Sequence, residues 1–188
     1  MRADAEAKRQ DVLDAAWRVM AAKGSDVSTR TITEAAGVGA GTLYRHFPTR
    51  DDLVVGVVHE VERRVRAVID AHEDGWTRDA VATWQDLVHD LADLGIGAIA
   101  FQLAPLAERH PGLARGNESR ADDLFGSALR RAKSAGVVAE DVDVICFFLG
   151  LATVTRPLPE HARVSRPHQQ DWLVDVYLRG LRPSADGD

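Results

Sequence analysis

Apolar residues recur every three or four positions along almost the whole chain, which is the spacing of an α-helix with one buried face. No clear hairpin signal separates runs of alternating apolar and polar residues, so no strand is expected. Helices are expected over residues 5–23, 28–36, 40–46, 50–72, 78–93, 96–109, 117–135, 141–156 and 167–181. We therefore predict an all-α protein of about nine helices.

Glycine and proline residues separate these predicted helices. Gly24 stops the first helix, Pro48 breaks the third, and a proline-containing loop over 157–166 precedes the last. Gly95, Pro111, Gly112 and Gly136 punctuate the second half, and the tail after Pro183 is expected to fray. We expect a first domain over residues 1–50, a long connecting helix over 50–72, a joint over 72–77, and a second domain over 73–188.

The predicted N-terminal helices have identifiable inner faces. Ser28 is the expected N-cap of the second helix, which Ile32 and Ala35 anchor, and Thr49 is the expected cap of the long helix. In that long helix Glu60 is expected to be solvated. The apolar stripes of the first and fourth helices are Val12, Leu13, Ala16, Val19 and Met20, and Leu53, Val57, Val61, Val65, Val68 and Ile69.

The most informative stretch, over 28–53, predicts a helix, a tight turn at Gly37 and Val38, and a second short helix. Leu43 and Phe47 lie one turn apart and are expected to point inward. The opposite face is small at its start and rich in hydrogen-bonding groups at its end: Ala40, Gly41, Thr42, Tyr44, Arg45 and His46. A helix that enters the major groove of DNA needs this combination of little bulk and well-placed donors.

One group of residues in this region matches a known pattern: Val12, Leu13, Ala15, Ala16, Val19, Met20 and Gly24, then Ile32, Ala35, Ala36, Gly37 and Val38, then Gly41, Thr42, Leu43, Tyr44, His46, Phe47, Pro48, Arg50 and Leu53. Through these residues the sequence resembles the TetR family of transcriptional regulators over about residues 6–65. The run over 37–50 is similar to a variant typical of actinobacterial regulators. The resemblance implies a helix-turn-helix DNA-binding domain joined by the long helix to an α-helical domain for ligand binding and dimerisation. It implies no cofactor.

The resemblance also implies roles for individual residues. Arg45 is the candidate for a bidentate guanine contact, and Ala40 for contact with a thymine methyl group. Arg50, with the backbone amides that follow it, would clamp a phosphate. Thr42, Tyr44 and His46 would mostly hold phosphates, Arg2, Lys8 and Arg9 would add electrostatic attraction, and the full DNA-binding set is Arg30, Gly39, Ala40, Gly41, Thr42, Tyr44, Arg45, His46 and Arg50.

Two glycines in the short helix need a reason. Many relatives have serine where Gly39 stands, and glycine is a weaker helix cap that also lacks a hydroxyl for a phosphate contact. Gly41 inside the helix costs about 1 kcal/mol relative to alanine. A close approach of the backbone to DNA would explain the presence of Gly41.

The second domain carries the predicted ligand pocket and dimer surface. The segment over 141–156 is apolar nearly all round and must be covered on both sides. The resemblance implies that the last two helices of each subunit form a four-helix dimer interface, although burial within one chain would also explain the pattern. His89 and Gln102 could orient a polar group of an unknown effector. The pocket candidates, for which an ordinary core is the alternative, are Trp84, Leu87, Leu91, Phe101, Leu103, Phe125, Phe147 and Leu151.

The charge distribution fits a DNA-binding head on an acidic body. The net charge is −6, but residues 1–50 carry a net +2 and residues 51–188 a net −8. The single cysteine, Cys146, lies in an apolar run, where we expect it to be buried and unreactive. No apolar run is long enough to span a membrane and no secretory signal is present, so a cytoplasmic protein is expected.

Other chemistries lack the residues that they require. The glycines at 37, 39 and 41 follow a helix rather than a strand, which argues against a dinucleotide site. Asp86, His89, Asp90 and Asp93 favour a solvated face over a metal site, and no nucleophile motif supports an enzyme. We predict a DNA-binding regulator, most simply a homodimeric repressor that a small apolar or amphipathic molecule releases from a palindromic operator. An activator, a ligand-independent regulator and a helical ligand-binding module without DNA binding remain open.

Overall fold

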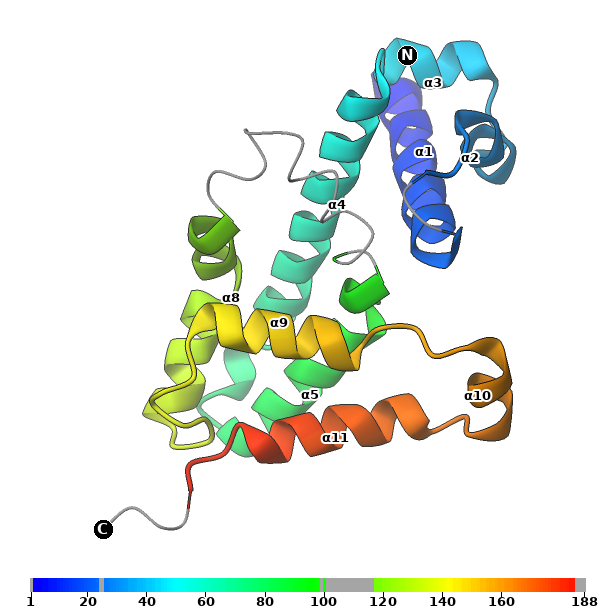
Figure 1. Ribbon diagram of the computed structural model, residues 1–188. Helices are drawn as coiled ribbons and strands as arrows, with labels where there is room; N and C mark the ends of the chain where they lie inside the picture. The colour runs from blue at the N-terminus through cyan, green and yellow to red at the C-terminus, as the bar shows by residue number, and fades with distance from the viewer. Residues whose placement is uncertain (1, 24–25, 99, 101–116, 185–188) are drawn as a thin grey trace. The chain divides into compact units, whose positions relative to one another are not determined.

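The computed structural model describes residues 2–23, 26–98, 100 and 117–184 (Figure 1). Within these residues there is no β-strand, and the all-α prediction is confirmed. The nine described α-helices and one 3-10 turn are α1 (Arg2–Lys23), α2 (Thr29–Ala36), α3 (Ala40–His46), α4 (Arg50–Ala71), η1 (Glu73–Gly75), α5 (Ala80–Asp93), α8 (Asn117–Ser134), α9 (Val144–Val154), α10 (Glu160–Ser165) and α11 (Gln169–Gly180).

Several predicted features lie outside the described residues. They are most of the helix expected over 96–109, the break at Pro111 and Gly112, the stop at Gly24 and the last part of the tail. None of the described helices is both long enough and apolar enough to cross a membrane.

The described residues fall into two compact units. Those up to Glu62, together with residue 100, belong to the first unit, and those over 63–98 and 117–184 belong to the second. The division falls inside α4, within the segment that the sequence predicts as a connecting helix.

The first unit is organised around α1. Val12, Leu13, Ala16 and Met20 are buried as predicted, whereas Val19 is half-buried. Trp17 lies on the buried side as well. A continuous apolar face of α1 therefore supports the two short helices that follow it.

The helix α2 begins as predicted but buries a different face. The Ser28 hydroxyl accepts a hydrogen bond from the Thr31 amide at 3.1 Å, and Gly37 ends the helix with a φ of 67°. Ile32 is buried, but the prediction for Ala35 is wrong because Ala35 is exposed and Thr33 is buried. The inner face of α2 is formed by positions 32, 33 and 36, so position 35 points toward solvent.

A capping box starts α4 directly after the break at Pro48. The Thr49 amide and hydroxyl donate to the Asp52 carboxylate at 3.0 and 2.6 Å, and the Asp52 amide donates back to the Thr49 hydroxyl at 3.1 Å. These hydrogen bonds from Thr49 lower the pKa of Asp52. The predicted cap at Thr49 is confirmed.

The buried face of α4 is broader than the predicted stripe. Leu53, Val57, Val65 and Ile69 are buried, and Val61 and Val68 are half-buried. The prediction that Glu60 is solvated is wrong, because Glu60 is only 4% exposed. Glu60 lies seven residues after Leu53 and three after Val57, so the helical repeat places it on the same face as the apolar residues.

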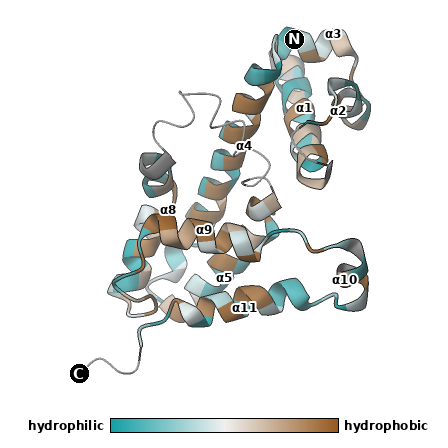
Figure 2. Cartoon of the chain, in the orientation of Figure 1, coloured by the Kyte–Doolittle hydropathy of each residue, from teal (hydrophilic) through white to brown (hydrophobic). Residues whose placement is uncertain are grey.

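In the second unit, aspartate residues cap two of the helices. The Asp79 carboxylate accepts from the Ala82 amide at 2.9 Å at the start of α5, and the Asp143 carboxylate accepts from the Cys146 amide at 2.6 Å at the start of α9. The left-handed residues Gly95 and Gly136, with φ of 69° and 70°, end α5 and α8 as the sequence predicts. Figure 2 shows the hydrophobic residues concentrated along α9 and the neighbouring part of α11.

One close approach in the second unit requires glycine. The Gly97 amide donates to the Thr155 hydroxyl at 2.9 Å, and that hydroxyl donates to the Leu151 carbonyl at 2.7 Å. A Cβ on Gly97 would overlap the carbonyl oxygen of Ala152. This contact fixes residues 96–98 against the C-terminal half of α9.

Two predictions for the second unit are wrong. The expected loop over 157–166 contains the short helix α10, whose last turn is closed by a 2.8 Å hydrogen bond from the Arg166 amide to the Ala162 carbonyl. Cys146 is exposed, not buried, because α9 buries only the side that carries Phe147, Leu151 and Ala152 within the chain.

Candidate DNA-reading surface and ligand-binding core

The helix α3 separates an inner face from an outer face. Leu43 and Phe47 are 1% and 2% exposed, respectively, and hold α3 against the rest of the first unit. On the outer side Ala40, Gly41, Tyr44 and Arg45 are exposed, while Thr42 and His46 are half-buried. All nine residues predicted to contact DNA lie in the first unit: Arg30 on α2, Arg50 at the start of α4, and the other seven on or directly before α3.

Gly39, which caps α3, and Gly41 within it pack against none of the described residues. Gly39 caps the helix without a side-chain hydrogen bond, and its carbonyl accepts from the Thr42 and Leu43 amides at 2.9 and 3.2 Å. A Cβ at Gly39 or Gly41 would meet open space. Since alanine would favour the helix at position 41, packing among the described residues does not explain glycine there.

Two side chains at the outer face are held by partners on α2. The Tyr44 hydroxyl lies 3.4 Å from the Thr29 hydroxyl, so the polar end of the Tyr44 side chain is held at the start of α2. The Arg30 guanidinium donates to the Glu34 carboxylate at 2.8 Å, and this hydrogen bond together with the negative charge raises the pKa of Arg30. In the free chain Glu34 therefore partly neutralises one of the predicted DNA-binding cations.

A contact that sequence reasoning missed lies at the end of α3. The Arg9 guanidinium lies over the Phe47 ring at 5.4 Å from its centroid, in the range of a cation–π interaction. Phe47 also occupies the space beside Gly56, where a Cβ would come within 2.7 Å of the ring. Arg9 was expected to attract DNA, and no local pattern in the sequence links it to Phe47. Lys8, another such residue, pairs with Asp4 at 3.2 Å.

The predicted pocket residues form a common core in the second unit. Trp84 and Phe147 have ring centroids 5.2 Å apart, and Phe125 and Phe147 have centroids 5.7 Å apart. Trp76, Phe148 and Tyr177, which are not among the predicted pocket residues, extend this aromatic cluster. The six described pocket candidates are all buried: Trp84, Leu87, Leu91, Phe125, Phe147 and Leu151.

The polar candidates for ligand binding have other partners or cannot be placed. His89 lies 3.0 Å from the Asp175 carboxylate and links α5 to α11. Phe101, Leu103 and Gln102 lie outside the described residues. The Tyr177 hydroxyl donates to the Phe147 carbonyl at 2.6 Å, and burial raises the pKa of Tyr177.

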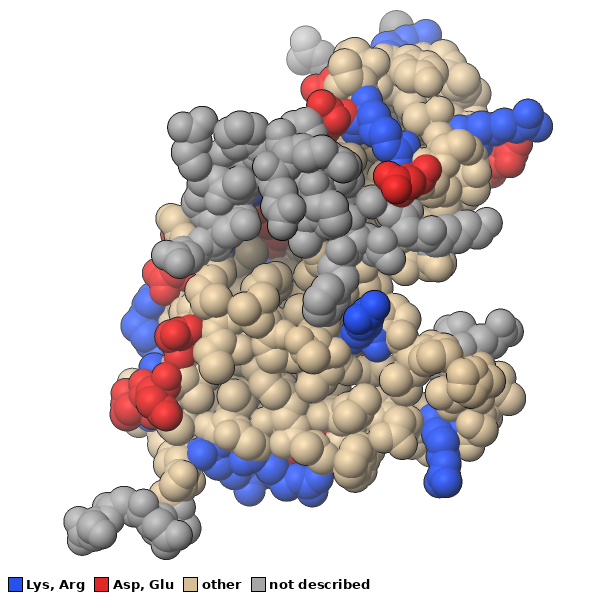
Figure 3. Space-filling model, in the orientation of Figure 1, with Lys and Arg blue, Asp and Glu red and all other residues tan. Residues whose placement is uncertain are grey.

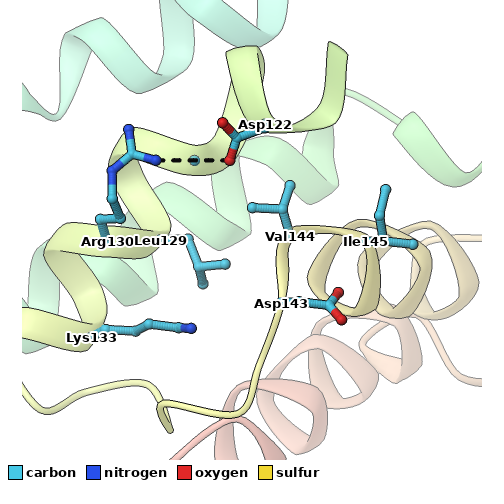
Figure 4. Close-up of a pocket in the computed structure, with 8 residues that line it drawn as sticks. Asp122, Leu129, Arg130, Lys133, Asp143, Val144 and Ile145 are labelled. Atoms are coloured by element: carbon cyan, nitrogen blue, oxygen red, sulfur yellow. Dashed lines mark ion pairs between the residues drawn. The ribbon is translucent and has the colours of Figure 1, made fainter. Parts of the chain in front are cut away.

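A separate open cleft of about 610 Å³ lies between α8 and the start of α9 (Figure 4). Arg130 and Asp122 form an ion pair of 3.7 Å across Gly126 at one side of it. Asp143, Val144 and Ile145 line the opposite side. The cleft includes none of the predicted pocket residues, so the aromatic cluster and this cleft are distinct features of the second unit.

An apolar face on α9 and α11 is uncovered in the single chain. Leu149 is 56% exposed and lies one turn from the exposed Cys146 and Thr153 on α9. Trp172 and Val176 are exposed one turn apart on α11. Figure 3 shows a broad surface without charged side chains over α9 and the adjoining part of α11. The exposed apolar side chains of α9 and α11 make this face a candidate for contact with another surface.

Comparisons with known proteins cover both parts of the chain. Residues 12–57 match the family model for bacterial regulatory proteins of the tetR family, and residues 75–183 match the model for the C-terminal domain of SbtR-like transcriptional regulators. A helix-turn-helix transcriptional repressor from Mycobacterium tuberculosis is 29% identical over 184 residues, which is 95% of each chain.

Solved structures agree with these family matches. A TetR transcription regulatory protein from Mycobacterium vanbaalenii is 32% identical, with a TM-score of 0.62 over 97% of this chain and 99% of that one. The TetR-like regulator LfrR from Mycobacterium smegmatis, solved in complex with proflavine, is 22% identical, with a TM-score of 0.70 over 94% of both chains. The second of these likenesses concerns the fold alone.

Proposed function

The chain belongs to the TetR family of bacterial regulatory proteins and is a DNA-binding transcriptional regulator. From this premise we propose that it is a repressor, and that a small apolar or amphipathic molecule releases it from a palindromic operator. The family is a class of DNA-binding regulators rather than of enzymes. The observation that carries the proposal is the outer face of α3, where Tyr44 and Arg45 are exposed opposite the buried Leu43 and Phe47. The relative from Mycobacterium tuberculosis is a transcriptional repressor, which supports repression rather than activation.

In this proposal α3 lies in the major groove of the operator. Arg45 reads a guanine through two hydrogen bonds, and Ala40 contacts a thymine methyl group. Gly41 allows the backbone to approach the DNA, which is consistent with the open space around it. Thr42, Tyr44, His46 and Arg50 hold the phosphate backbone and fix the register of the helix, and Arg30 reaches a base or a phosphate. Gly39 lies beside the DNA at the start of the helix.

We assign DNA binding to residues 1–50, the connection to residues 50–72, and ligand binding and dimerisation to residues 73–188. The uncovered face of α9 and α11 is the proposed dimer surface, where two helices from each of two chains form a four-helix interface. Two chains present two reading helices to the two halves of a palindrome. A DNA-binding regulator acts on the chromosome, so a cytoplasmic location is part of the proposal.

The effector binds, in this proposal, at the aromatic cluster of the second unit. Its buried rings suit an apolar or amphipathic molecule. LfrR, which shares the fold, was solved in complex with the small molecule proflavine. Binding there would change the position of α4 and the spacing of the two reading helices. A coupling free energy of about 1–3 kcal/mol between the two sites is enough to lower operator affinity more than tenfold.

Selection of genomic DNA fragments by the purified full chain tests this proposal. We expect the recovered fragments to share a near-palindromic site, and affinity for that site to fall steeply with rising salt because phosphate contacts release counterions. Arg45→Ala and Tyr44→Ala should each abolish specific binding while the dimer stays folded, since both side chains are exposed. Recovery of fragments without a shared site, or undiminished binding by both variants, would refute the assignment of the reading face.

A further inference from the structure

The indole of Trp84 lies at the centre of the aromatic cluster with one polar atom unsatisfied. Trp84 is 3% exposed on α5, and among the described residues its Nε1–H has no hydrogen-bond partner. It is the one buried side-chain nitrogen or oxygen in the described part of the chain with this property. The other polar side chains buried in this part of the chain have partners, so the indole N–H requires an explanation of its own.

The groups nearest to Trp84 in the chain and in the cluster are engaged elsewhere. The Thr83 hydroxyl donates to the Asp79 carbonyl at 2.6 Å. The Phe147 carbonyl accepts from Tyr177 at 2.6 Å, and the Phe147 and Trp76 rings lie with centroids 5.2 and 6.3 Å from that of Trp84. Two aromatic rings flank the indole, and the Thr83 hydroxyl and the Phe147 carbonyl are used in other hydrogen bonds.

A buried donor without an acceptor destabilises the folded chain, because the N–H loses its hydrogen bond to water. Phenylalanine at position 84 would supply an aromatic ring without that cost. The N–H is explained if it acquires an acceptor when the protein works.

We propose that the Trp84 Nε1–H donates a hydrogen bond to the effector, and that the effector is a largely apolar ring compound with an acceptor atom at that point. This inference rests on the proposed effector site at the aromatic cluster. Tryptophan has a donor and no acceptor on its ring nitrogen, so the matching ligand atom is a carbonyl, lactone or ether oxygen or an aromatic nitrogen. A pure hydrocarbon of the same shape leaves the N–H unsatisfied and binds less tightly.

Matched pairs of probes isolate this hydrogen bond. Quinoline and naphthalene have the same shape but differ in one acceptor nitrogen, and fluorenone and fluorene differ in one carbonyl oxygen. We would titrate all four into the full chain, the Trp84→Phe variant and a Trp76→Phe control, which removes a different indole of the same cluster. Affinities come from changes in ligand and protein fluorescence, and labelling of the indole nitrogens with ¹⁵N follows each N–H proton by NMR.

In the parent chain and the Trp76→Phe control we expect the acceptor-bearing member of at least one pair to bind about three- to tenfold more tightly than its hydrocarbon partner. In Trp84→Phe this preference should disappear, while the hydrocarbon binds with unchanged affinity. The Trp84 indole proton should shift with the acceptor-bearing probe and much less with the hydrocarbon. Thermal unfolding and circular dichroism of Trp84→Phe check that the variant stays folded; a small fall in the melting temperature is expected, because phenylalanine fills less of the core than tryptophan.

Three results would overturn the inference. They are the absence of any acceptor preference in the parent chain, the same preference in Trp84→Phe, and an indole proton of Trp84 that is already hydrogen-bonded in the free protein, as a buried water would make it. Operator binding by the parent chain is measured separately. Its failure would refute the proposed function without changing the outcome of the probe titrations.

Discussion

Among single side chains, Glu34 is predicted to weaken operator binding. Its carboxylate lies 2.8 Å from the Arg30 guanidinium, and it places a negative charge beside the surface that faces DNA. We predict that Glu34→Gln raises operator affinity several-fold, because Arg30 no longer loses an ion pair on binding and the repulsion of phosphates falls. Titrations of labelled operator over a range of salt concentrations measure this effect.

The matched variant is Arg30→Gln, which removes the other half of the pair. If Arg30 contacts a phosphate, this variant binds more weakly and the slope of log affinity against log salt falls by about one. An unchanged slope in Arg30→Gln, or weaker binding by Glu34→Gln, would contradict the role given to this pair.

Burial of individual residues was the least predictable property. The predictions of Ser28 and Thr49 as helix caps are confirmed, because a cap depends only on the few residues that follow it. The predicted burial of Ala35 and the predicted exposure of Glu60 are wrong, because the centre of a helix face depends on which neighbours pack against it. A shift of one residue around the helix exchanges a buried position for an exposed one, and local periodicity does not resolve that shift.

Among the helices, α3 offers a test in which stability and function change in opposite directions. A Cβ at Gly41 meets open space within the chain, so Gly41→Ala should raise the free energy of unfolding by up to about 1 kcal/mol. The added methyl group lies on the outer face and should keep the backbone from the bases, which lowers specific affinity at least tenfold. Chemical denaturation and operator titration of the same preparation measure the two effects.

The opposite result is expected at Gly97, where the same substitution has no room. The Cβ of Gly97→Ala would overlap the Ala152 carbonyl and displace the hydrogen bond to Thr155. We predict a loss of about 1–3 kcal/mol in the free energy of unfolding, measured by denaturation at one protein concentration. A neutral Gly97→Ala would show that residues 96–98 do not pack on α9 as closely as described.

The helices themselves were predicted well where their signals are local and poorly where they are not. The bounds of α3 followed from Gly39 and Pro48, and the ends of α5 and α8 from Gly95 and Gly136. The helix α10 was missed because its six residues lie between prolines and show no apolar repeat. The aromatic cluster was predicted only in part, since Trp76 joins it from the turn directly after η1 and Tyr177 joins it from α11, 30 residues after Phe147.

For the assembled regulator, the uncovered face of α9 decides whether two chains associate as proposed. The segment over 141–156 was expected to be covered on both sides, and within one chain only the side of Phe147 and Leu151 is covered. The sequence therefore predicted the need for a second surface, but not which residues form it. Leu149, at 56% exposed, is the largest apolar side chain on the uncovered side of α9.

We predict that Leu149→Glu separates the dimer without unfolding the chain. The side chain is exposed in the single chain, so a charge there costs little until a second chain covers it. In a two-fold interface the substitution buries two carboxylates without partners, which should raise the dissociation constant of the dimer about a hundredfold or more. Sedimentation velocity over a range of concentrations measures this constant, and circular dichroism checks the helices.

The control for this variant is Val164→Glu, which adds the same charge at a 78% exposed residue of α10, outside the proposed interface. It should remain a dimer and bind the full palindrome like the parent. Leu149→Glu should bind the full palindrome no more tightly than a single half-site, because each monomer brings one α3 and gains nothing from the second half. A Leu149→Glu variant that remains a dimer with parental operator affinity would show that α9 does not form the interface, and that two reading helices are paired through another part of the chain.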